Sequence, residues 1–429
     1  MTSAVRRRSV ATLGLGSVGA GILAYVFFVT AARALGPEDA ASISVLWTWW
    51  SFSAAAVTFP LQHWIARTVK ASGGERAVRN GLPRLAVLVT VVAVFAGLVS
   101  WVWGERLFRT SGPAFPALVV AVTLGAGLLG VVRGHLTGRG RFSAVGLNLI
   151  LENAVRSVAA LALAAAGWTE PWAFGLALVA GYSVAAANGR ALVSWDDNGS
   201  GEAGNPVAAV GSTGLGQLLA QAALTGAPVV LALSGARPQD VTAVFAGLAL
   251  FRAPYTVVSA MMASVTGRLT LLWLNGSAAA WRQVEKAVVA VLAVGGTLVG
   301  ALLGWWVGPW LIALVFGSDV VLRADVAALL AAGTVLAMAN LVVVVMIVAQ
   351  GRNAALMRGW TTAFLAGLCW ALVSPLEPVL GVAWLFVAVQ GAALVWLGVE
   401  EALGARHPRG LSAAARRAAP PRPARPPRR

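Results

Sequence analysis

The stretch LILENAVRSVAALALAAAG, residues 149–167, decides the fold. It is apolar and close to the length of about 20 residues that crosses a bilayer, yet it carries Glu152 and Arg156. Similar stretches recur along the 429 residues, of which 59% are hydrophobic and only 11% charged. A water-soluble chain of this length needs far more charge on its surface. The sequence therefore predicts an all-α polytopic membrane protein.

Apolar runs of membrane-spanning length occur about twelve times along the chain. They begin just after a basic N-terminus, and the first run is too long for a signal peptide. We expect transmembrane helices at residues 10–34, 41–66, 83–103, 113–134, 142–166, 171–193, 207–233, 239–266, 286–308, 324–350, 354–374 and 378–401.

A polar segment, residues 194–206, divides these runs into six and six, and the two sets share short motifs. Both sets start on the same side of the membrane, so the pattern indicates a parallel repeat, an arrangement typical of secondary transporters with a central cavity between the halves. The matching pairs are Pro37 with Pro238, Asp39 with Asp240, and Gly138-Arg139 with Gly351-Arg352.

The basic residues predict the topology. With the N-terminus in the cytoplasm, 25 of the 32 Lys and Arg residues fall on the cytoplasmic side, as the positive-inside rule requires. We therefore expect both termini to be cytoplasmic and the protein to lie in the cell membrane. The predicted domains are a basic N-terminus (1–9), an N-terminal six-helix half (10–193), a cytoplasmic linker (194–206), a C-terminal six-helix half (207–401) and a Pro- and Arg-rich disordered tail (402–429).

The tail accounts for much of the net charge of +16. It contains no Phe, Tyr or Trp to stack on bases, which argues against nucleic-acid binding. Either the tail contacts anionic membrane lipids, or it is a solvated topology signal without a specific partner.

Glu152 and Arg156 are the first candidate functional residues, because charges inside a bilayer are costly and rarely face lipid. Their i, i+4 spacing places them on one helix face, with Asn148 one turn earlier. In one interpretation this polar stripe lines the central cavity, where Arg156 binds an anionic headgroup and Glu152 positions Arg156 or exchanges a proton. In the other, the pair neutralises itself and fastens the helix to a neighbour.

Arg252 has no acidic residue within reach in its own predicted span. Pro254 follows closely and predicts a kink, since proline cannot donate a backbone hydrogen bond. Freed carbonyl groups are tolerated where a helix lines a cavity, so we expect Arg252 to face a cavity or partner helix rather than to extend to the membrane surface.

Other polar residues complete the candidate site. Gln217, Gln221 and Asn340 either line the cavity or form hydrogen bonds between helices. His63 is either a proton-coupling group or a packing residue. The chain has one cysteine and three scattered histidines, and it lacks familiar nucleophile or phosphate-binding motifs. We therefore expect no catalytic residues, metal site or cofactor, and a protein that is not an enzyme.

Two motifs carry a family resemblance. ARALGPEDAA, residues 32–41, resembles the R-x-L-G-P-E-x-aromatic-G stretch after the first helix of polysaccharide (Wzx-type) flippases, although Ala40-Ala41 stand where that family has an aromatic residue and glycine. GRGRF, residues 138–142, leads into a helix with a mid-membrane arginine, which is also similar to that family. These flippases belong to the superfamily that includes the multidrug and toxin extrusion transporters and the lipid II flippases. The 6+6 layout extends the resemblance over the whole chain.

The resemblance implies an alternating-access transporter that flips a polyprenyl-diphosphate-linked oligosaccharide to the outer leaflet for cell-surface polysaccharide assembly. Arg252 and Arg156 would then hold the diphosphate, and the lipid tail would remain in the bilayer. A polysaccharide polymerase and glycosyltransferases are candidate partners. The extrusion transporters often bind a coupling cation at an acid in the first span, but residues 9–34 contain none. The alternatives are an ion-coupled small-molecule exporter and a non-transporting scaffold of a polysaccharide assembly complex.

Overall fold

The protein is helical almost throughout, as expected. The computed structural model describes residues 3–189, 192, 194–200, 204–259, 278–350 and 352–406. The first half contains α1 (Ser3–Ser53), η1 (Ala54–Thr58), α2 (Phe59–Ser72), α3 (Arg76–Val102), α4 (Gly104–Phe108), α5 (Ala114–Gly138), α6 (Phe142–Ala165), α7 (Pro171–Ala180), η2 (Gly181–Ser183) and α8 (Val184–Ala187). The second half contains α10 (Pro206–Thr225), α11 (Ala227–Leu233), α12 (Pro238–Phe251), α14 (Ala278–Ala290), η3 (Val291–Gly296), α15 (Thr297–Phe316), α16 (Ala324–Ala349), α17 (Asn353–Val373) and α18 (Pro378–Arg406).

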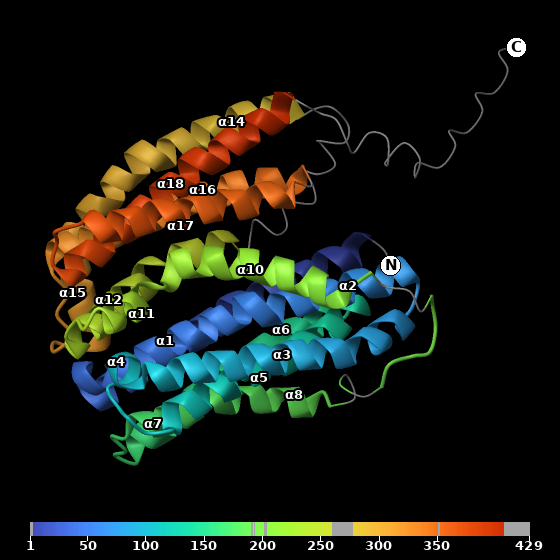
Figure 1. Ribbon diagram of the computed structural model, residues 1–429, viewed down its shortest axis with the longest axis horizontal. Helices are drawn as coiled ribbons and strands as arrows, with labels where there is room; N and C mark the ends of the chain where they lie inside the picture. The colour runs from blue at the N-terminus through green and yellow to red at the C-terminus, as the bar shows by residue number, and fades with distance from the viewer. Residues whose placement is uncertain are drawn as a thin grey trace, which may run out of the picture.

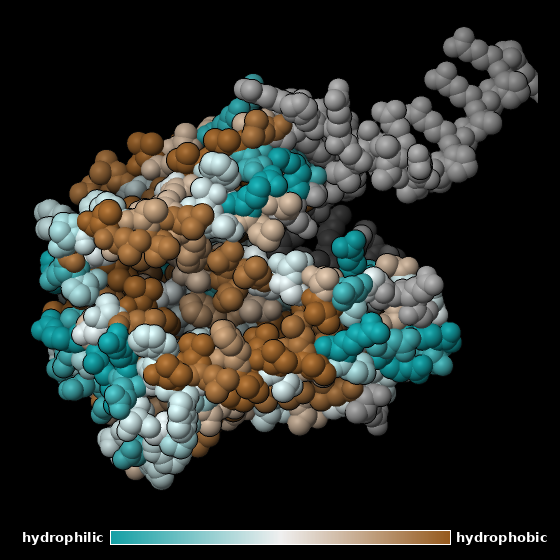
Figure 2. Space-filling view, in the orientation of Figure 1, coloured by the Kyte–Doolittle hydropathy of each residue, from teal (hydrophilic) through white to brown (hydrophobic). Residues whose placement is uncertain are grey.

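The predicted polytopic membrane architecture is confirmed. Among the described residues, nine helices are long and apolar enough to cross a membrane, and a tenth span results if the bent pair Pro238–Phe251 and Ala253–Ser259 is one span. One of the nine, Gly16–Ser72, contains two predicted spans, and the apolar helix Pro171–Ala187 is shorter. Figure 2 shows apolar residues covering the flanks of the molecule, with hydrophilic residues gathered at its two ends. This is the surface that a bilayer requires.

The first two predicted spans differ from expectation because no loop separates them. α1 passes through a break at Gly36, whose φ of 75° and ψ of 170° are not helical, and Pro37 starts the next helical stretch. A positive φ is readily adopted by glycine, and proline fits the first turn of a helix. The motif at residues 32–41, which was expected in a loop, therefore lies at a sharp break between two nearly continuous helices.

The halves meet at the end of the molecule opposite the start of α1 and the end of α18, and α10 of the second half also packs against η1 and α2 of the first. Figure 1 shows the helices converging there and diverging toward the N-terminus and the end of α18. Hydrogen bonds join the halves at the converging end. They run from the Arg33 guanidinium to the carbonyl oxygens of Leu314 and Val315 at 2.7 and 2.9 Å, from Thr242 Oγ1 to the Pro37 oxygen at 2.7 Å, and from Arg109 to the Ala236 oxygen.

The repeat is visible in matching helix starts, and it corrects one predicted register. Arg141 precedes α6 with φ −85° and ψ 57°, and its N–H donates to the Leu136 oxygen five residues earlier. Arg352 precedes α17 with φ −98° and ψ 53°, and its N–H donates to the Ile347 oxygen, also five residues earlier. Arg352 therefore corresponds to Arg141, and the predicted match with Arg139 was displaced by two residues, because GRGR offers two equivalent alignments.

The segment 194–200 of the predicted linker is folded onto the first half. Arg139 Nε and Nη2 lie 2.6 and 2.9 Å from the two carboxylate oxygens of Glu75, whose Oε2 also accepts from the Asp196 N–H. The Asn198 side chain accepts from the Glu75 N–H, and Asp197 pairs with Arg76 and Arg79. We call this group, with Glu75, Arg139 and residues 194–200, the linker clasp.

Candidate functional site

The charged residues predicted on α6 lie in the interior of the first half. Asn148 and Glu152 are each 2% exposed, and Arg156 has no exposed surface. Arg156 Nη2 lies 2.5 Å from Glu152 Oε1, so the i, i+4 pair is formed. Arg156 Nε also donates to the Leu178 carbonyl oxygen on α7 at 2.8 Å. In this conformation the pair fastens α6 to α7, which is the second of the two interpretations of this stripe.

The surroundings of Arg156 are shaped to hold its guanidinium. Its Cζ lies 4.9 Å from the centroid of the Trp50 ring and 5.0 Å from that of Tyr182, and such cation–π contacts strengthen where water is excluded. A Cβ at Gly181 would lie 2.4 Å from Arg156 Nε. The glycine therefore makes room for the arginine at the break between α7 and α8.

Arg133 on α5 is a member of this cluster that the sequence analysis missed. Its Nε donates to Asn148 Oδ1 at 2.8 Å, and its Nη2 pairs with Glu152. The positive-inside count places Arg133 with the basic residues on the cytoplasmic side, but the structure buries it within α5, where it is only 5% exposed. Its position inside the predicted span 113–134 was the sequence signal that could have identified Arg133 as a residue within the membrane. The charged cluster, defined as Arg133, Asn148, Glu152 and Arg156, therefore holds two cations and one anion.

Three other predicted residues line one cavity, which we call the amide pocket. Gln217 and Gln221 come from α10 and Asn340 from α16, and the cavity has a volume of about 210 Å³. Ala55 and Phe59 of the first half complete its wall, so the pocket lies between the two halves. Three further side chains that were not predicted from the sequence line it, which are Tyr255, Trp360 and Gln390.

The amide pocket is held together by hydrogen bonds between neutral groups. Asn340 Nδ2 lies 2.9 Å from both the carbonyl oxygen and Oε1 of Gln390, and Gln390 Nε2 donates to the Ala223 oxygen at 3.1 Å. Gln221 Nε2 donates to Thr225 Oγ1 at 3.2 Å. Among the described residues, the lining contains neither a carboxylate nor a basic side chain.

Arg252 and Pro254 lie where the chain bends. The axes of α12 and the segment Ala253–Ser259 differ by 43°, and Arg252 occupies the junction. Arg252 is partly exposed, and no described residue accepts a hydrogen bond from its side chain. Tyr255, one turn later, lines the amide pocket, so Arg252 lies close to the pocket without lining it. No described contact joins Arg252 to Arg156.

His63 is exposed on α2, one turn beyond Phe59 of the amide pocket. The structure therefore places it near the space between the halves but not among the lining residues.

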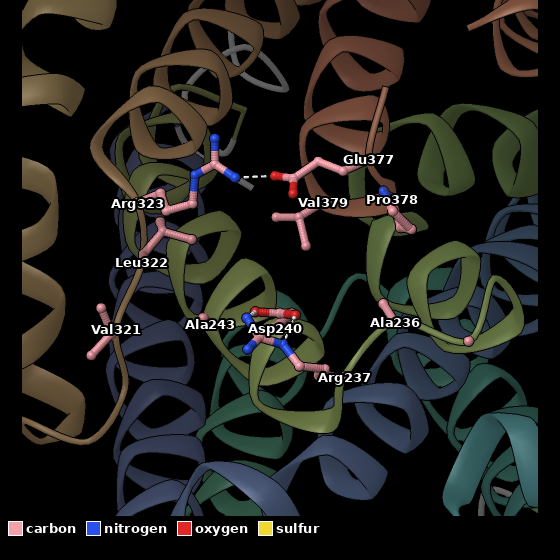
Figure 3. A pocket seen from close by; sticks show the side chains of 11 residues that line it. Ala236, Arg237, Asp240, Ala243, Val321, Leu322, Arg323, Glu377, Pro378 and Val379 are labelled. Carbon is pink, nitrogen blue, oxygen red and sulfur yellow. Dashed lines mark hydrogen bonds and ion pairs between the residues drawn. The ribbon is translucent and has the colours of Figure 1, made fainter. Parts of the chain in front are cut away.

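A separate cavity of about 340 Å³ opens at the converging end of the second half (Figure 3). Its charged residues satisfy one another. Arg237 Nε lies 2.9 Å from Asp240 Oδ2, and Arg323 pairs with Glu377 and with Asp325, the latter at 2.5 Å. This mutual pairing leaves little charge for a ligand, so the amide pocket is the better candidate site.

The fold and the pocket between two six-helix halves define the class as a two-half polytopic membrane bundle, and solved structures share this fold. A eukaryotic MATE transporter, AtDTX14, matches with a TM-score of 0.64 and 14% identity over 96% of this chain and 98% of its own. The lipid II flippase MurJ in an inward closed conformation matches with a TM-score of 0.66 and 12% identity over 90% and 86%.

A multidrug resistance MATE family transporter of the MOP superfamily, in an inward-facing conformation, matches with a TM-score of 0.60 and 15% identity over 94% and 96%. No protein-family model matches the sequence, and no curated protein matches it. The fold expected from the resemblance is therefore confirmed, whereas the polysaccharide flippase subfamily stays a prediction.

Proposed function

We propose that this protein is a membrane transporter that flips a polyprenyl-diphosphate-linked oligosaccharide from the inner to the outer leaflet by alternating access. The observation that carries the proposal is the amide pocket between the halves. Amide groups both donate and accept hydrogen bonds, as sugar hydroxyl groups do. Trp360 and Tyr255 add aromatic surface for the apolar face of a sugar ring.

Arg252 is the proposed contact for the diphosphate. It stands at the bend beside the pocket with no described acceptor, and a guanidinium offers forked donors to phosphate oxygens. Arg156 is engaged by Glu152 and Leu178 in this conformation, so a role in binding the diphosphate requires a conformation in which these contacts open. Both termini and the open end of the bundle then face the cytoplasm.

An ion-coupled small-molecule exporter is the second candidate, because two of the similar folds are named as MATE transporters. The lining of the amide pocket supports the flippase over this second candidate. Its described lining has no carboxylate for a cationic drug, which favours a neutral or anionic cargo. A scaffold role within a polysaccharide assembly complex makes no use of the pocket at all.

The test is a flipping assay in liposomes with a fluorescent prenyl-diphosphate oligosaccharide. Wild type is compared with Gln217→Ala and Arg252→Ala, and Ser212→Ala, an exposed change on α10 outside the pocket, is the control. We expect exchange by wild type and the control, and a loss of tenfold or more in the two variants. No exchange by wild type with any sugar tried, under proton or sodium gradients, would contradict the flippase assignment.

A further inference from the structure

α10, the first helix of the second half, lies between the two halves, and its first part packs on the first half (Figure 1). Val210 is 3% exposed in an apolar cluster with residues of η1, α2 and α3. A Cβ at Gly81 of α3 would lie 3.5 Å from Pro206 Cγ, and one at Gly214 would lie 2.4 Å from the Ala56 oxygen of η1. Glycine therefore lets α10 approach the first half closely over residues 206–214. We call this contact the α10 seam.

The last part of α10 belongs to the second half. Ala223 is 7% exposed in a cluster with Trp360 and Val389, and its carbonyl oxygen accepts from Gln390 Nε2 at 3.1 Å. α10 ends at Thr225, and the next helix, α11, has a proline, Pro228, in its first turn. Proline has no N–H, so the backbone hydrogen bonds are interrupted there. α10 can therefore tilt relative to α11 at this break.

The α10 seam covers one flank of the amide pocket. Gln217 and Gln221 follow the seam on α10 and line the pocket, whereas Ala55 and Phe59 line it from the first half. Pro206, at the start of the seam, lies about 16 Å before Gln217 along the helix. With both termini in the cytoplasm, as the charge distribution predicts, the seam lies between the pocket and the cytoplasmic surface, at the level of the inner leaflet.

The α10 seam is held by weaker contacts than the junction between α1 and the second half. Among the described residues, no hydrogen bond joins α10 to the first half. At the α1 junction, the Phe28 and Phe245 ring centroids lie 4.3 Å apart, and Thr242 Oγ1 donates to the Pro37 oxygen. Opening the seam leaves no unpaired polar group in lipid, and lipid chains replace the lost apolar contacts at little cost. The seam is therefore the contact that can open within the bilayer.

We propose that the α10 seam is a side entrance to the amide pocket. α10 tilts about the break at Gly226 and Pro228, and the polar end of the lipid-linked substrate enters between α10 and α2 from the inner leaflet. This inference rests on the proposed function and refines it, because it names the route by which the substrate reaches the pocket. The lipid chain stays in the bilayer, so only the polar end passes the seam.

The first test measures whether the seam opens toward lipid. Val210→Cys is compared with Ala126→Cys, a residue of the same apolar cluster that has no exposed surface. Both are made with Cys369→Ala, because Cys369 is the one cysteine of the chain. Protein in vesicles reacts with a lipid-soluble maleimide or with a charged one that stays in water. We expect Val210→Cys to react with the lipid-soluble reagent at least tenfold faster than Ala126→Cys, without such a gain for the charged reagent.

The second test locks the seam. Gly81→Cys with Pro206→Cys, also with Cys369→Ala, places two thiols across it, because the would-be Cβ of Gly81 lies 3.5 Å from Pro206 Cγ and a disulfide joins Cβ atoms about 3.5–4.5 Å apart. Flipping of a fluorescent prenyl-diphosphate oligosaccharide is measured after oxidation and again after reduction. We expect oxidation to slow flipping at least tenfold and reduction to restore it, whereas each single-cysteine variant keeps its rate under both conditions.

Equal maleimide rates at Val210→Cys and Ala126→Cys would overturn the side entrance, because the seam then stays closed. A matching gain with the charged reagent would also overturn it, because the seam then opens to water. Undiminished flipping with the disulfide formed would do the same while leaving the flippase function in place. If wild type moves no lipid-linked oligosaccharide, the proposed function fails instead, and the maleimide rates decide separately whether the seam opens.

Discussion

Asn340 on α16 and Gln390 on α18 lock together inside the amide pocket, since one Asn340 N–H₂ group lies 2.9 Å from both the carbonyl oxygen and Oε1 of Gln390. Gln390 Nε2 in turn donates a hydrogen bond to the Ala223 oxygen on α10, so these hydrogen bonds connect three helices. Asn340 Oδ1 is buried without a partner among the described residues. A buried acceptor of this kind gains a hydrogen bond when a substrate hydroxyl group arrives.

Replacing Asn340 by alanine therefore has two expected effects. Gln390 Oε1 loses its donor, which costs about 1–3 kcal/mol of stability, and flipping of the oligosaccharide slows. Thermal unfolding in detergent and the liposome assay measure these effects. The control is Thr334→Ala on the same helix, whose hydroxyl bonds, among the described residues, to the Leu330 oxygen of α16. Equal losses of transport in the two variants would show that Asn340 has no role in the pocket beyond packing.

Much of this architecture could be predicted from the sequence, because membrane spans are encoded locally. The length of each span can be read directly from its run of apolar residues. The i, i+4 spacing of Glu152 and Arg156 within such a run is enough to predict a polar helix face that is shielded from lipid. The same local signal located Gln217, Gln221 and Asn340, which the fold then brings into one pocket.

The rest depends on which helix faces meet, and a single sequence does not encode this locally. Nothing in the local sequence distinguishes Tyr255, Trp360 and Gln390 from other residues of their helices. They form a site only when the helices that line the amide pocket come together in the folded protein. Arg133 lies near the end of an apolar run, where a basic residue indicates the membrane surface, yet its partner Glu152 is on the next helix. The linker clasp was missed for the same reason, since Glu75 and Asp196 are far apart in the chain.

Glu152 is expected to be essential for folding because it is the anion between two buried guanidinium groups, those of Arg133 and Arg156. Glu152→Gln leaves two buried cations without their counter-charge, at a cost of about 3–5 kcal/mol. Removing one cation as well, in Glu152→Gln with Arg133→Gln, should restore part of this stability. Fluorescence-detected gel filtration and thermal unfolding measure both, with the exposed Glu105→Gln as control.

The same variants test the predicted proton coupling at Glu152. If Glu152→Gln folds as well as wild type but no longer responds to a proton gradient, the residue is a coupling group, and our structural expectation for the cluster is wrong.

Gly214 on α10 is expected to set the distance between the halves. A Cβ there would lie 2.4 Å from the Ala56 carbonyl oxygen of η1, a backbone atom that cannot rotate away. Gly211, one turn earlier, has no atom of the described residues within 4 Å of its would-be Cβ. Alanine inside a helix gains about 0.5–1 kcal/mol over glycine, so Gly211→Ala should be neutral or stabilising. Gly214→Ala should lower the unfolding temperature and slow transport, and identical melting curves would count against this close contact.

The linker clasp gives the expected pH dependence. Burial by itself raises the pKa of Glu75, but the hydrogen bonds from Arg139 and the Asp196 N–H, together with the Arg139 charge, lower the pKa below its ordinary value of 4.5. A carboxylate with a depressed pKa stabilises the folded state above its unfolded pKa, and this contribution is lost as the pH falls through the folded pKa. The clasp should therefore be intact at neutral pH and open only as the pH falls below the ordinary range of a glutamate carboxyl group.

Limited proteolysis checks this expectation through cleavage within residues 194–200, using an acid-active protease at each pH. In wild type we expect protection at neutral pH and rising cleavage once the pH falls below the ordinary glutamate pKa. Glu75→Gln removes the titrating group, so its cleavage should be raised at every pH with little pH dependence. Asp197 pairs with Arg76 and Arg79 at the surface, where solvent screens the charges, so Asp197→Asn should change cleavage much less. A wild-type profile that is flat from pH 8 to 3.5 would mean that Glu75 does not hold the linker against the first half.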